Sequence, residues 1–352
     1  MSRDPFRFEG GRVLLLDQTL LPDREETIEI RDARAMADAI SRLAVRGAPA
    51  IGIAAALALA VEATRDGSAS MRLERLEDAG RLLVASRPTA VNLAWAVDRV
   101  LGAARRALAR EPDIAPVSLA TLVRDEALAI WEEDRAASRA MAEHGASLFP
   151  TQTRFLTHCN TGALATGGGG TALAVLLELH RRRPNGIEVW ATETRPLLQG
   201  ARLTAWELRE AGVPFRLIAD SAAAHTILRG GIEGVLVGAD RIARNGDAAN
   251  KIGTLGLALA ASAANVPFVV VAPTSTIDPQ IADGAEIAVE ARAAEEVTAI
   301  RGMRLAPTGI RAENPAFDVT PARWIGAIVT ERGVHLGPAY DLGAAVDTKT
   351  RP

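Results

Sequence analysis

The sequence predicts an α/β protein with a smaller, mainly helical N-terminal domain that carries a small antiparallel sheet, followed by a domain built on a parallel sheet. Helical periodicity dominates the first 148 residues, whereas from about Thr153 short apolar runs alternate with amphipathic segments, as in βαβ units. The chain has 352 residues, more than one hydrophobic core usually serves. We therefore predict two domains, residues 1–148 and 149–352.

The N-terminal half is predicted to open with a hairpin and to continue as helices. Residues 12–31 place apolar and polar runs on either side of a Leu-Pro-Asp break, which is typical of two antiparallel strands. Apolar residues at three- and four-residue spacing then predict helices at 33–45, 50–64, 71–86, 91–110 and 118–148. The last helix is long, has Ser118 as its expected cap, and is interpreted as the connector to the second half.

Strands and helices alternate in the second half. Strands are expected at 155–158, 187–191, 215–219, 234–237 and 267–271, with helices between them at 171–183, 198–211, 221–229 and 251–264. Right-handed crossovers make these strands parallel, so their carboxyl ends share one edge of the sheet, where open α/β sheets bind ligands. A further helix is predicted at 321–331, with Thr320 as its cap and Pro321 in its first turn.

Polar residues follow two of these strands in a pattern that suits chemistry. His158, Cys159 and Asn160 end the first strand, and a glycine-rich turn follows them before the next helix. Backbone amides in such a turn suit an anion or an oxygen that becomes negative during reaction, although a lone cysteine there also fits simple packing. Asp240 follows the fourth strand and would face Cys159 if the two strands are neighbours. A carboxyl group in an apolar crevice can donate a proton near neutral pH, and an Asx turn is the other interpretation.

Three basic residues stand near expected helix starts. Arg46, Gly47 and Ala48 precede an apolar helix, so a guanidinium and helix-start amides together offer a phosphate cradle. The same residues also fit a helix boundary with a solvated arginine, and Arg87 has the same two interpretations. Lys251, beside Asn250, is either a surface lysine or an anion-binding group.

Composition argues against several classes of protein and site. A net charge of −3 leaves no footprint for nucleic acid or an anionic membrane. One cysteine cannot form an intrachain disulfide, and the first residues lack the apolar core of a signal peptide, so we expect a cytoplasmic protein without a membrane span. Five scattered histidines offer no metal-ligand spacing, and neither a dinucleotide fingerprint nor a Walker loop is present. No metal and no cofactor are therefore expected.

Six stretches are long enough to compare with known families. They are VRGAPAIG (45–52), SRPTAVNLAWAV (86–97), THCNTGALAT (157–166), TETRPLLQGARLTAWEL (192–208), VGADRIARNGDAANKIGT (237–254) and FDVTPARWIGAIVTERGV (317–334). In this order they resemble the 5-methylthioribose-1-phosphate isomerases of methionine salvage, which are related to the alpha, beta and delta subunits of initiation factor 2B. The resemblance covers nearly the whole chain.

The resemblance implies an aldose-ketose isomerase that converts 5-methylthio-D-ribose 1-phosphate to 5-methylthio-D-ribulose 1-phosphate without a cofactor. It implies a Rossmann-like C-terminal domain, a homodimer, and Cys159 and Asp240 as the catalytic pair. The implied substrate-binding residues are Arg46, Gly47, Ala48, Arg87, Gln199, Asn250 and Lys251.

Departures from the family pattern keep the substrate open. Gly169 and Leu255 stand where relatives tend to have aromatic residues, and Arg244 replaces a smaller residue. The alternatives are an isomerase of 5-deoxyribose 1-phosphate or ribose 1,5-bisphosphate, and a non-catalytic regulatory module like those of initiation factor 2B. The presence of Cys159 and Asp240 together with the implied binding residues argues against the module.

Overall fold

The computed structural model describes residues 4–88, 90–338, 340 and 342. The chain divides into two compact units, and each is described by itself. The helical unit comprises residues 4–137 and Ala163–Gly170, and the sheet unit comprises Ser138–Gly162 and residues 171–342. The chain thus leaves the sheet unit after Gly162 and returns to it at Thr171. The domain boundary expected at 148/149 stays a prediction.

The helical unit begins with an antiparallel sheet of β1 (Phe6–Glu9), β2 (Arg12–Leu16) and β3 (Thr27–Ile30), paired in that order. The predicted hairpin is confirmed by β2 and β3, in which Val13 pairs with Ile30, while β1 adds a strand outside it. The expected helices follow as α1 (Ala33–Ser41), α2 (Ala48–Ala63), α3 (Ala69–Ser86), α4 (Val91–Arg110) and α5 (Pro116–Ser147).

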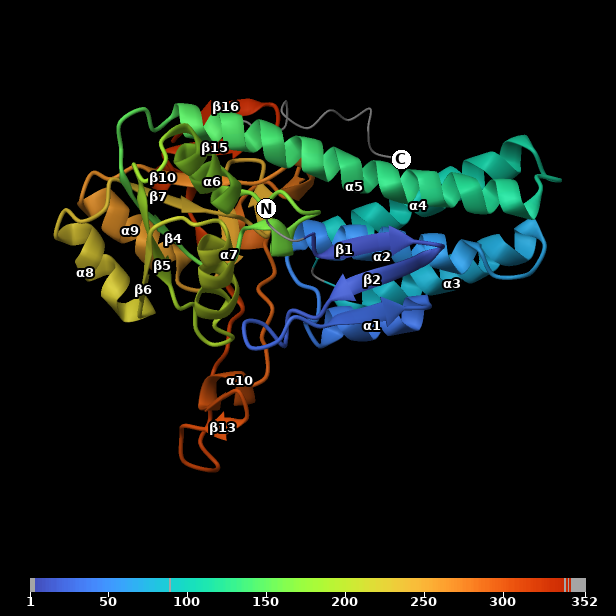
Figure 1. Cartoon of the computed structure of the whole chain (residues 1–352), viewed down its shortest axis with the longest axis horizontal. Helices are drawn as coiled ribbons and strands as arrows, with labels where there is room; N and C mark the ends of the chain where they lie inside the picture. Colours follow the sequence, from blue (N-terminus) through green and yellow to red (C-terminus); the bar gives the residue numbers. More distant parts are fainter. Residues whose placement is uncertain (1–3, 89, 339, 341, 343–352) are drawn as a thin grey trace. The chain divides into compact units, whose positions relative to one another are not determined.

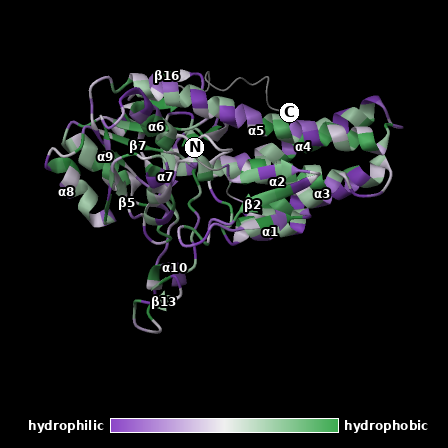
Figure 2. Cartoon of the chain, in the orientation of Figure 1, coloured by the Kyte–Doolittle hydropathy of each residue, from purple (hydrophilic) through white to green (hydrophobic). Residues whose placement is uncertain are grey.

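Helix α2 forms the centre of the core of the helical unit. Every residue of α2 except Pro49 is buried, as expected of a helix that is apolar on all sides. Small residues let its neighbours come close, since a Cβ added to Gly52 would lie 2.6 Å from the carbonyl oxygen of Asn92 in α4. Helix α5 differs in that hydrophilic and hydrophobic residues alternate along it (Figure 2).

The sheet unit is built on a mostly parallel sheet with the strand order β16-β15-β10-β7-β4-β5-β6, in which β16 runs antiparallel to β15. The strands are β4 (Arg154–Thr157), β5 (Glu188–Thr192), β6 (Phe215–Ile218), β7 (Gly234–Val237), β10 (Phe268–Val271), β15 (Ala327–Thr330) and β16 (Gly333–Leu336). The predicted parallel sheet is therefore confirmed. Its order makes β4 and β7 neighbours, which is the condition for Asp240 to face Cys159.

Helices surround this sheet (Figure 1). They are α6 (Ala172–Arg182), α7 (Ala205–Glu210), α8 (Ala223–Leu228) and α9 (Thr254–Ala263). Helices α8 and α9 share a core cluster with the sheet, in which Ile227 and Leu257 join Val235 and Val270. The helix predicted at 198–211 is divided, because Gly200–Thr204 form a π-helical turn before α7. No helix in the described part of the chain is long and apolar enough to cross a membrane.

The helix predicted at 321–331 is wrong. The segment consists of a 3-10 turn at Ala322–Trp324 and the buried strand β15. Apolar spacing favoured a helix, but Ile328, Val329 and Thr330 form a β-branched run that suits a strand enclosed by neighbours. Val329 pairs in parallel with Val271 of β10, so packing in the sheet decides the structure here.

A smaller sheet and an arm follow β7. The smaller sheet has the order β11-β8-β9-β14, with β8 (Arg241–Ala243), β9 (Ala248–Lys251), β11 (Ile277–Asp278) and β14 (Phe317–Thr320). Between β11 and β14, the arm carries α10 (Glu295–Thr298), β12 (Ala299–Ile300) and β13 (Met303–Arg304), and projects from the sheet unit (Figure 1).

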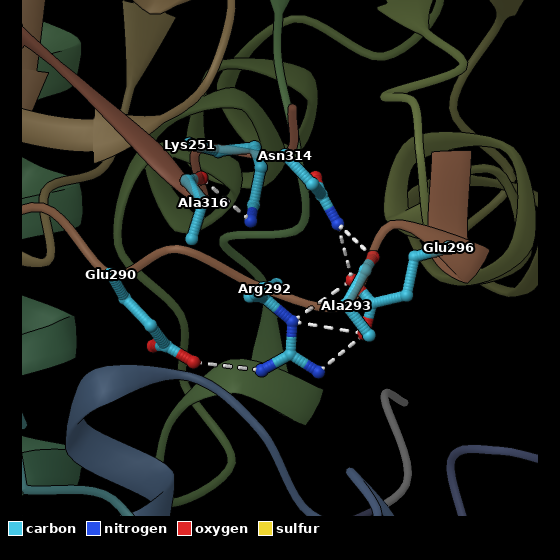
Figure 3. Close-up of polar contacts among 7 residues, drawn as sticks. All are labelled: Lys251, Glu290, Arg292, Ala293, Glu296, Asn314 and Ala316. Atoms are coloured by element: carbon cyan, nitrogen blue, oxygen red, sulfur yellow. Dashed lines mark hydrogen bonds and ion pairs between the residues drawn. The ribbon is translucent and has the colours of Figure 1, made fainter. Parts of the chain in front are cut away.

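An ion-pair network stiffens the neck of the arm. The Arg292 guanidinium binds Glu296 at 2.6 Å and Glu290 at 2.9 Å, and the Asn314 amide donates to Glu296 at 3.0 Å (Figure 3). The hydrogen bonds that Arg292 donates to Glu296 raise the pKa of Arg292 above its ordinary value, so the guanidinium stays charged. The two chain segments of the neck are thus held together by their side chains.

Candidate active site

The strand order places the predicted catalytic residues at the topological switch point of the sheet. From β4 the chain continues to β5 and β6 on one side, and from β7 to β10 and β15 on the other. Strands β4 and β7 pair in parallel, with Thr157 opposite Leu236. Cys159 follows β4 and Asp240 follows β7. Ligands of open α/β sheets bind in the crevice beyond the strand ends at such a point.

Cys159 has an unusual backbone conformation. Its φ is +63°, in the left-handed region that residues other than glycine rarely adopt, and its residue exposure is 6%. Its N–H donates to Thr194 Oγ1 at 2.9 Å, and its carbonyl oxygen accepts from Thr204 Oγ1 at 2.6 Å. Both partners come from the segment that follows β5, which therefore holds the cysteine loop in place.

A buried carboxylate lies beneath the residues after Cys159. Asn160 donates through Nδ2 to Glu207 Oε1 at 2.6 Å, and Glu207 is only 3% exposed. A Cβ added to Gly162 would lie 2.3 Å from Glu207 Oε2, so glycine is needed there for close approach. Glu207 thus supports the start of the turn from within α7.

The glycine-rich turn belongs to the helical unit, and most of its amides already have partners there. The N–H of Gly167 donates to Asp134 Oδ2 at 2.6 Å, and those of Gly168 and Gly170 donate to Thr166 Oγ1 at 3.4 and 2.8 Å. The expectation that these three amides hold an anion is therefore wrong. The glycines serve instead to bend the chain, since Gly168 and Gly170 have φ values of +115° and +95°.

The predicted phosphate cradle also lies in the helical unit. Gly47 is the N-cap of α2 with φ +105°, and a Cβ there would lie 2.4 Å from the Ala165 carbonyl oxygen. The half-buried Arg46 precedes it and Ala48 begins the helix, so both flank the N-terminus of α2, and their binding of phosphate stays a prediction. Arg87 lies between α3 and α4.

Asn250 and Lys251 lie in β9 and not at a helix start, because α9 begins at Thr254. Both are buried, with exposures of 4% and 8%, so Lys251 is not a surface lysine. Lys251 Nζ donates to the Ala316 carbonyl oxygen at 2.9 Å (Figure 3) and lies 5.0 Å from the centre of the Phe317 ring. The N–H of Asp240 donates to the Ala249 carbonyl oxygen at 2.9 Å, which brings Asp240 next to this pair.

A carboxylate of the chain itself occupies the start of α9. Asp318 accepts from the N–H of Gly253 at 2.7 Å and of Leu255 at 3.1 Å. Burial raises the pKa of the Asp318 carboxyl above its ordinary value, although these two N–H groups oppose the rise. An anion near Lys251 would therefore meet the ammonium group and not these amides.

His158 joins the cysteine loop to the Lys251 strand. Its ring is buried, with Nδ1 2.6 Å from Thr192 Oγ1 and Nε2 2.9 Å from the Ile252 carbonyl oxygen. Burial lowers the pKa of His158, so the imidazole is neutral near pH 7. Through these contacts the structure gathers Cys159, Asp240, Asn250 and Lys251 at one edge of the sheet unit.

Gln199 comes from the same edge, in the loop after β5. It is 6% exposed, and within the described residues its buried Oε1 has no hydrogen-bond partner. Buried polar atoms are nearly always paired, so an unpaired one at a strand end is typical of a ligand site. Among the described residues, no group of three or more His, Cys, Asp or Glu is arranged to hold a metal ion.

Comparison with known proteins decides the family. The sequence pattern of the initiation factor 2 subunit family matches residues 44–336. The chain belongs to this family. It is 50% identical over 341 residues to the methylthioribose-1-phosphate isomerase of Pelotomaculum thermopropionicum, an alignment that covers 96% of this chain and 92% of the relative.

Two solved structures share the fold over nearly the whole chain. The crystal structure of 5-methylthioribose 1-phosphate isomerase from Pyrococcus horikoshii OT3 has a TM-score of 0.88 at 38% identity, covering 97% of this chain and 94% of that one. The crystal structure of translation initiation factor eIF-2B, subunit delta, from A. fulgidus has a TM-score of 0.84 at 39% identity, covering 96% and 97%. Proteins with two different names therefore resemble this chain closely.

Several supporting residues of this family member escape the sequence interpretation. Thr194 and Asp220 stand in loops at the strand ends, but nothing in the sequence shows that they bond to each other. Thr204 and Glu207 are hidden in the apolar periodicity of the segment expected as one helix at 198–211. The only local sign of the π turn is Gly200, which interrupts the helical pattern of that segment.

Proposed function

We propose that the chain is a methylthioribose-1-phosphate isomerase, which converts 5-methylthio-D-ribose 1-phosphate to 5-methylthio-D-ribulose 1-phosphate in methionine salvage. The observation that carries this proposal is the 50% identity to such an isomerase across 96% of the chain. The similarity to the Pyrococcus horikoshii isomerase structure supports it over nearly the same length. The edge of the sheet supplies a thiol, a carboxyl group and an ammonium group for the chemistry.

Ring opening comes first. The anomeric oxygen of the substrate carries the phosphate, so no free aldehyde exists until the sugar ring opens. We assign the acid to Asp240, which is half-buried beside the buried Asn250 and Lys251. A protonated carboxyl group there would donate to the ring oxygen.

Hydrogen must then move from C2 to C1, and two routes are open. In the enediol route, the Cys159 thiolate takes the C2 proton and the proton returns at C1. In the hydride route, hydrogen passes directly between the carbons and the protein moves the hydroxyl protons. Solvent deuterium at C1 of the product, after reaction in heavy water, would support the first route and exclude the second.

Substrate binding is proposed for the residues that the family resemblance implies. In the sheet unit, Gln199 offers a buried amide oxygen to a sugar hydroxyl, and Lys251 offers a buried ammonium group to an oxyanion. Asn250 Nδ2 donates to Thr254 Oγ1, and its amide oxygen is proposed to accept from a sugar hydroxyl. In the helical unit, Arg46, Gly47, Ala48 and Arg87 are proposed to bind phosphate. We also propose a cytoplasmic homodimer, which sedimentation equilibrium would test.

The likeness to the A. fulgidus eIF-2B subunit favours a second candidate, a non-catalytic regulatory module. Incubating the purified protein with 5-methylthioribose 1-phosphate, 5-deoxyribose 1-phosphate and ribose 1,5-bisphosphate separates the candidates. We expect ketose formation chiefly from the first sugar. Preference for either of the other two would correct the substrate, and no turnover of any by folded protein would favour the module.

A further inference from the structure

Two neighbouring loops at the sheet edge have the same rare backbone conformation. Cys159 after β4 and Thr194 after β5 both have φ +63°, and Thr194 is completely buried. For a β-branched residue such as threonine this conformation is a genuine outlier. Such conformations persist only where the surroundings enforce them, and they concentrate at functional sites.

Thr194 is held in this conformation from its backbone. Its N–H donates to Asp220 Oδ1 at 2.7 Å, and the N–H of Arg195 donates to Asp220 Oδ2 at 2.6 Å. The carbonyl oxygen of Thr194 accepts from the N–H of Leu198 at 2.8 Å. The Asp220 carboxylate and the turn to Leu198 therefore fix the backbone of Thr194 without any contact from its side chain.

The side chain of Thr194 then connects to Cys159 and to His158. Thr194 Oγ1 lies 2.9 Å from the backbone nitrogen of Cys159 and 3.2 Å from Thr192 Oγ1. Thr192 Oγ1 in turn lies 2.6 Å from His158 Nδ1. A chain of hydrogen bonds thus leads from the imidazole to the amide of the cysteine.

The donors and acceptors in this series of hydrogen bonds follow from the bond between His158 and the Ile252 carbonyl oxygen. The Ile252 carbonyl oxygen can only accept, so His158 Nε2 carries the hydrogen. Nδ1 of the neutral ring then accepts from the Thr192 hydroxyl. The Thr194 hydroxyl donates to Thr192, whose Oγ1 lies 3.2 Å away and whose carbonyl oxygen lies 3.3 Å away. With either acceptor, a lone pair of Thr194 Oγ1 faces the N–H of Cys159.

We propose that Thr194 is a positioning residue, whose hydroxyl oxygen, oriented by His158 through Thr192, holds Cys159 in its left-handed conformation. The proposal deepens the proposed function, because it names what fixes the reacting thiol. It concerns the geometry of Cys159, so it can also be tested without any sugar phosphate.

Two substitutions separate this role from packing. Thr194→Val keeps the buried methyl group and the β-branch but removes the oxygen, whereas Thr194→Ser keeps the oxygen and removes the methyl group. If Thr194 positions Cys159, Val is the harmful change and Ser restores the function. If Thr194 only fills space, the order is reversed.

The single cysteine of the chain makes thiol chemistry a direct measure of Cys159 geometry. We expect Thr194→Val to lower kcat about 10- to 100-fold with KM changed less than about threefold, and to speed alkylation of Cys159 by iodoacetamide at least about fivefold. In Thr194→Ser both quantities should stay within about threefold of the wild type. A Val variant that matches the wild type in alkylation, or a Ser variant that is the worse of the two, would overturn the proposal.

Two further experiments test the role of Thr194 when the first variant or the enzyme assay fails. Thr192→Val breaks the same chain one step away and should shift alkylation in the same direction, so it replaces Thr194→Val if thermal unfolding shows that variant to be unfolded. An unchanged rate in folded Thr192→Val would contradict the orientation by His158. If the wild type turns over none of the sugar phosphates, the proposed function fails, but the order of the alkylation rates still decides the role of Thr194.

Discussion

Gln199 shows at the scale of one residue how stability and binding can conflict. Its amide oxygen is buried, and within the described residues it has no hydrogen-bond partner. An unsatisfied buried acceptor costs about 1–3 kcal/mol of folding free energy, and an apolar replacement of similar shape recovers much of that cost. A residue that weakens the fold in this way is expected to gain its partner from a ligand.

We therefore predict that Gln199→Leu leaves the melting temperature unchanged or raises it, while it raises KM for the sugar phosphate about 10-fold or more. Steady-state kinetics and thermal unfolding measure the two effects. Thr276→Val is the matched control, because Thr276 Oγ1 is also buried without a partner in the described chain but is assigned no ligand. A Leu variant with unchanged KM would remove Gln199 from the binding residues.

At the scale of the elements, the π turn between β5 and α7 is closely packed against the sheet edge. A Cβ added to Gly200 would lie 1.7 Å from the Thr192 carbonyl oxygen, which is rigid backbone of the sheet edge. This close approach lets Thr204 and Glu207 reach the Cys159 loop from the following turns. The element thus connects the packing of the sheet to the geometry of the site.

Gly200→Ala should destabilise the protein by about 1–3 kcal/mol or more, because the new methyl group can be accommodated only by moving the strand end or the helix. Gly256→Ala in α9 is the matched control: nothing lies within 4 Å of a Cβ there, and alanine in an exposed helix should stabilise by about 0.5–1 kcal/mol. Urea unfolding of both variants gives the comparison. Equal effects of the two substitutions would refute the constraint at Gly200.

At the scale of the whole molecule, local patterns predicted most of the fold. The hairpin, the long helices and the alternating strands follow from periodicity, and the switch point follows once β4 and β7 are known to be neighbours. The segment 321–331 could not be predicted, because its place beside β10 depends on a partner far away in the sequence. Tertiary contacts decide such short apolar runs.

The candidate site also has parts that the sequence predicts and parts that it does not. Cys159 and Asp240 could be selected because strand ends carry the chemistry of α/β sheets. The role of the glycine-rich turn could not be predicted, because the N–H groups of Gly167 and Gly170 donate to the side chains of Asp134 and Thr166. The hydrogen bonds that hold Cys159 join the loops after β4, β5 and β6, which meet only in the folded sheet. Thr194 and Asp220 therefore have no local sequence signal.

We propose that this chain isomerises a ribose 1-phosphate through Cys159 and Asp240. The most direct measurement follows C1-labelled 5-methylthioribose 1-phosphate by carbon NMR with the wild type, Cys159→Ser and Asp240→Asn. We expect a ketose C1 signal with the wild type and rates about 100- to 10,000-fold lower with either variant, at unchanged folded structure. Conversion at the wild-type rate by a variant, or none by the wild type, would contradict it.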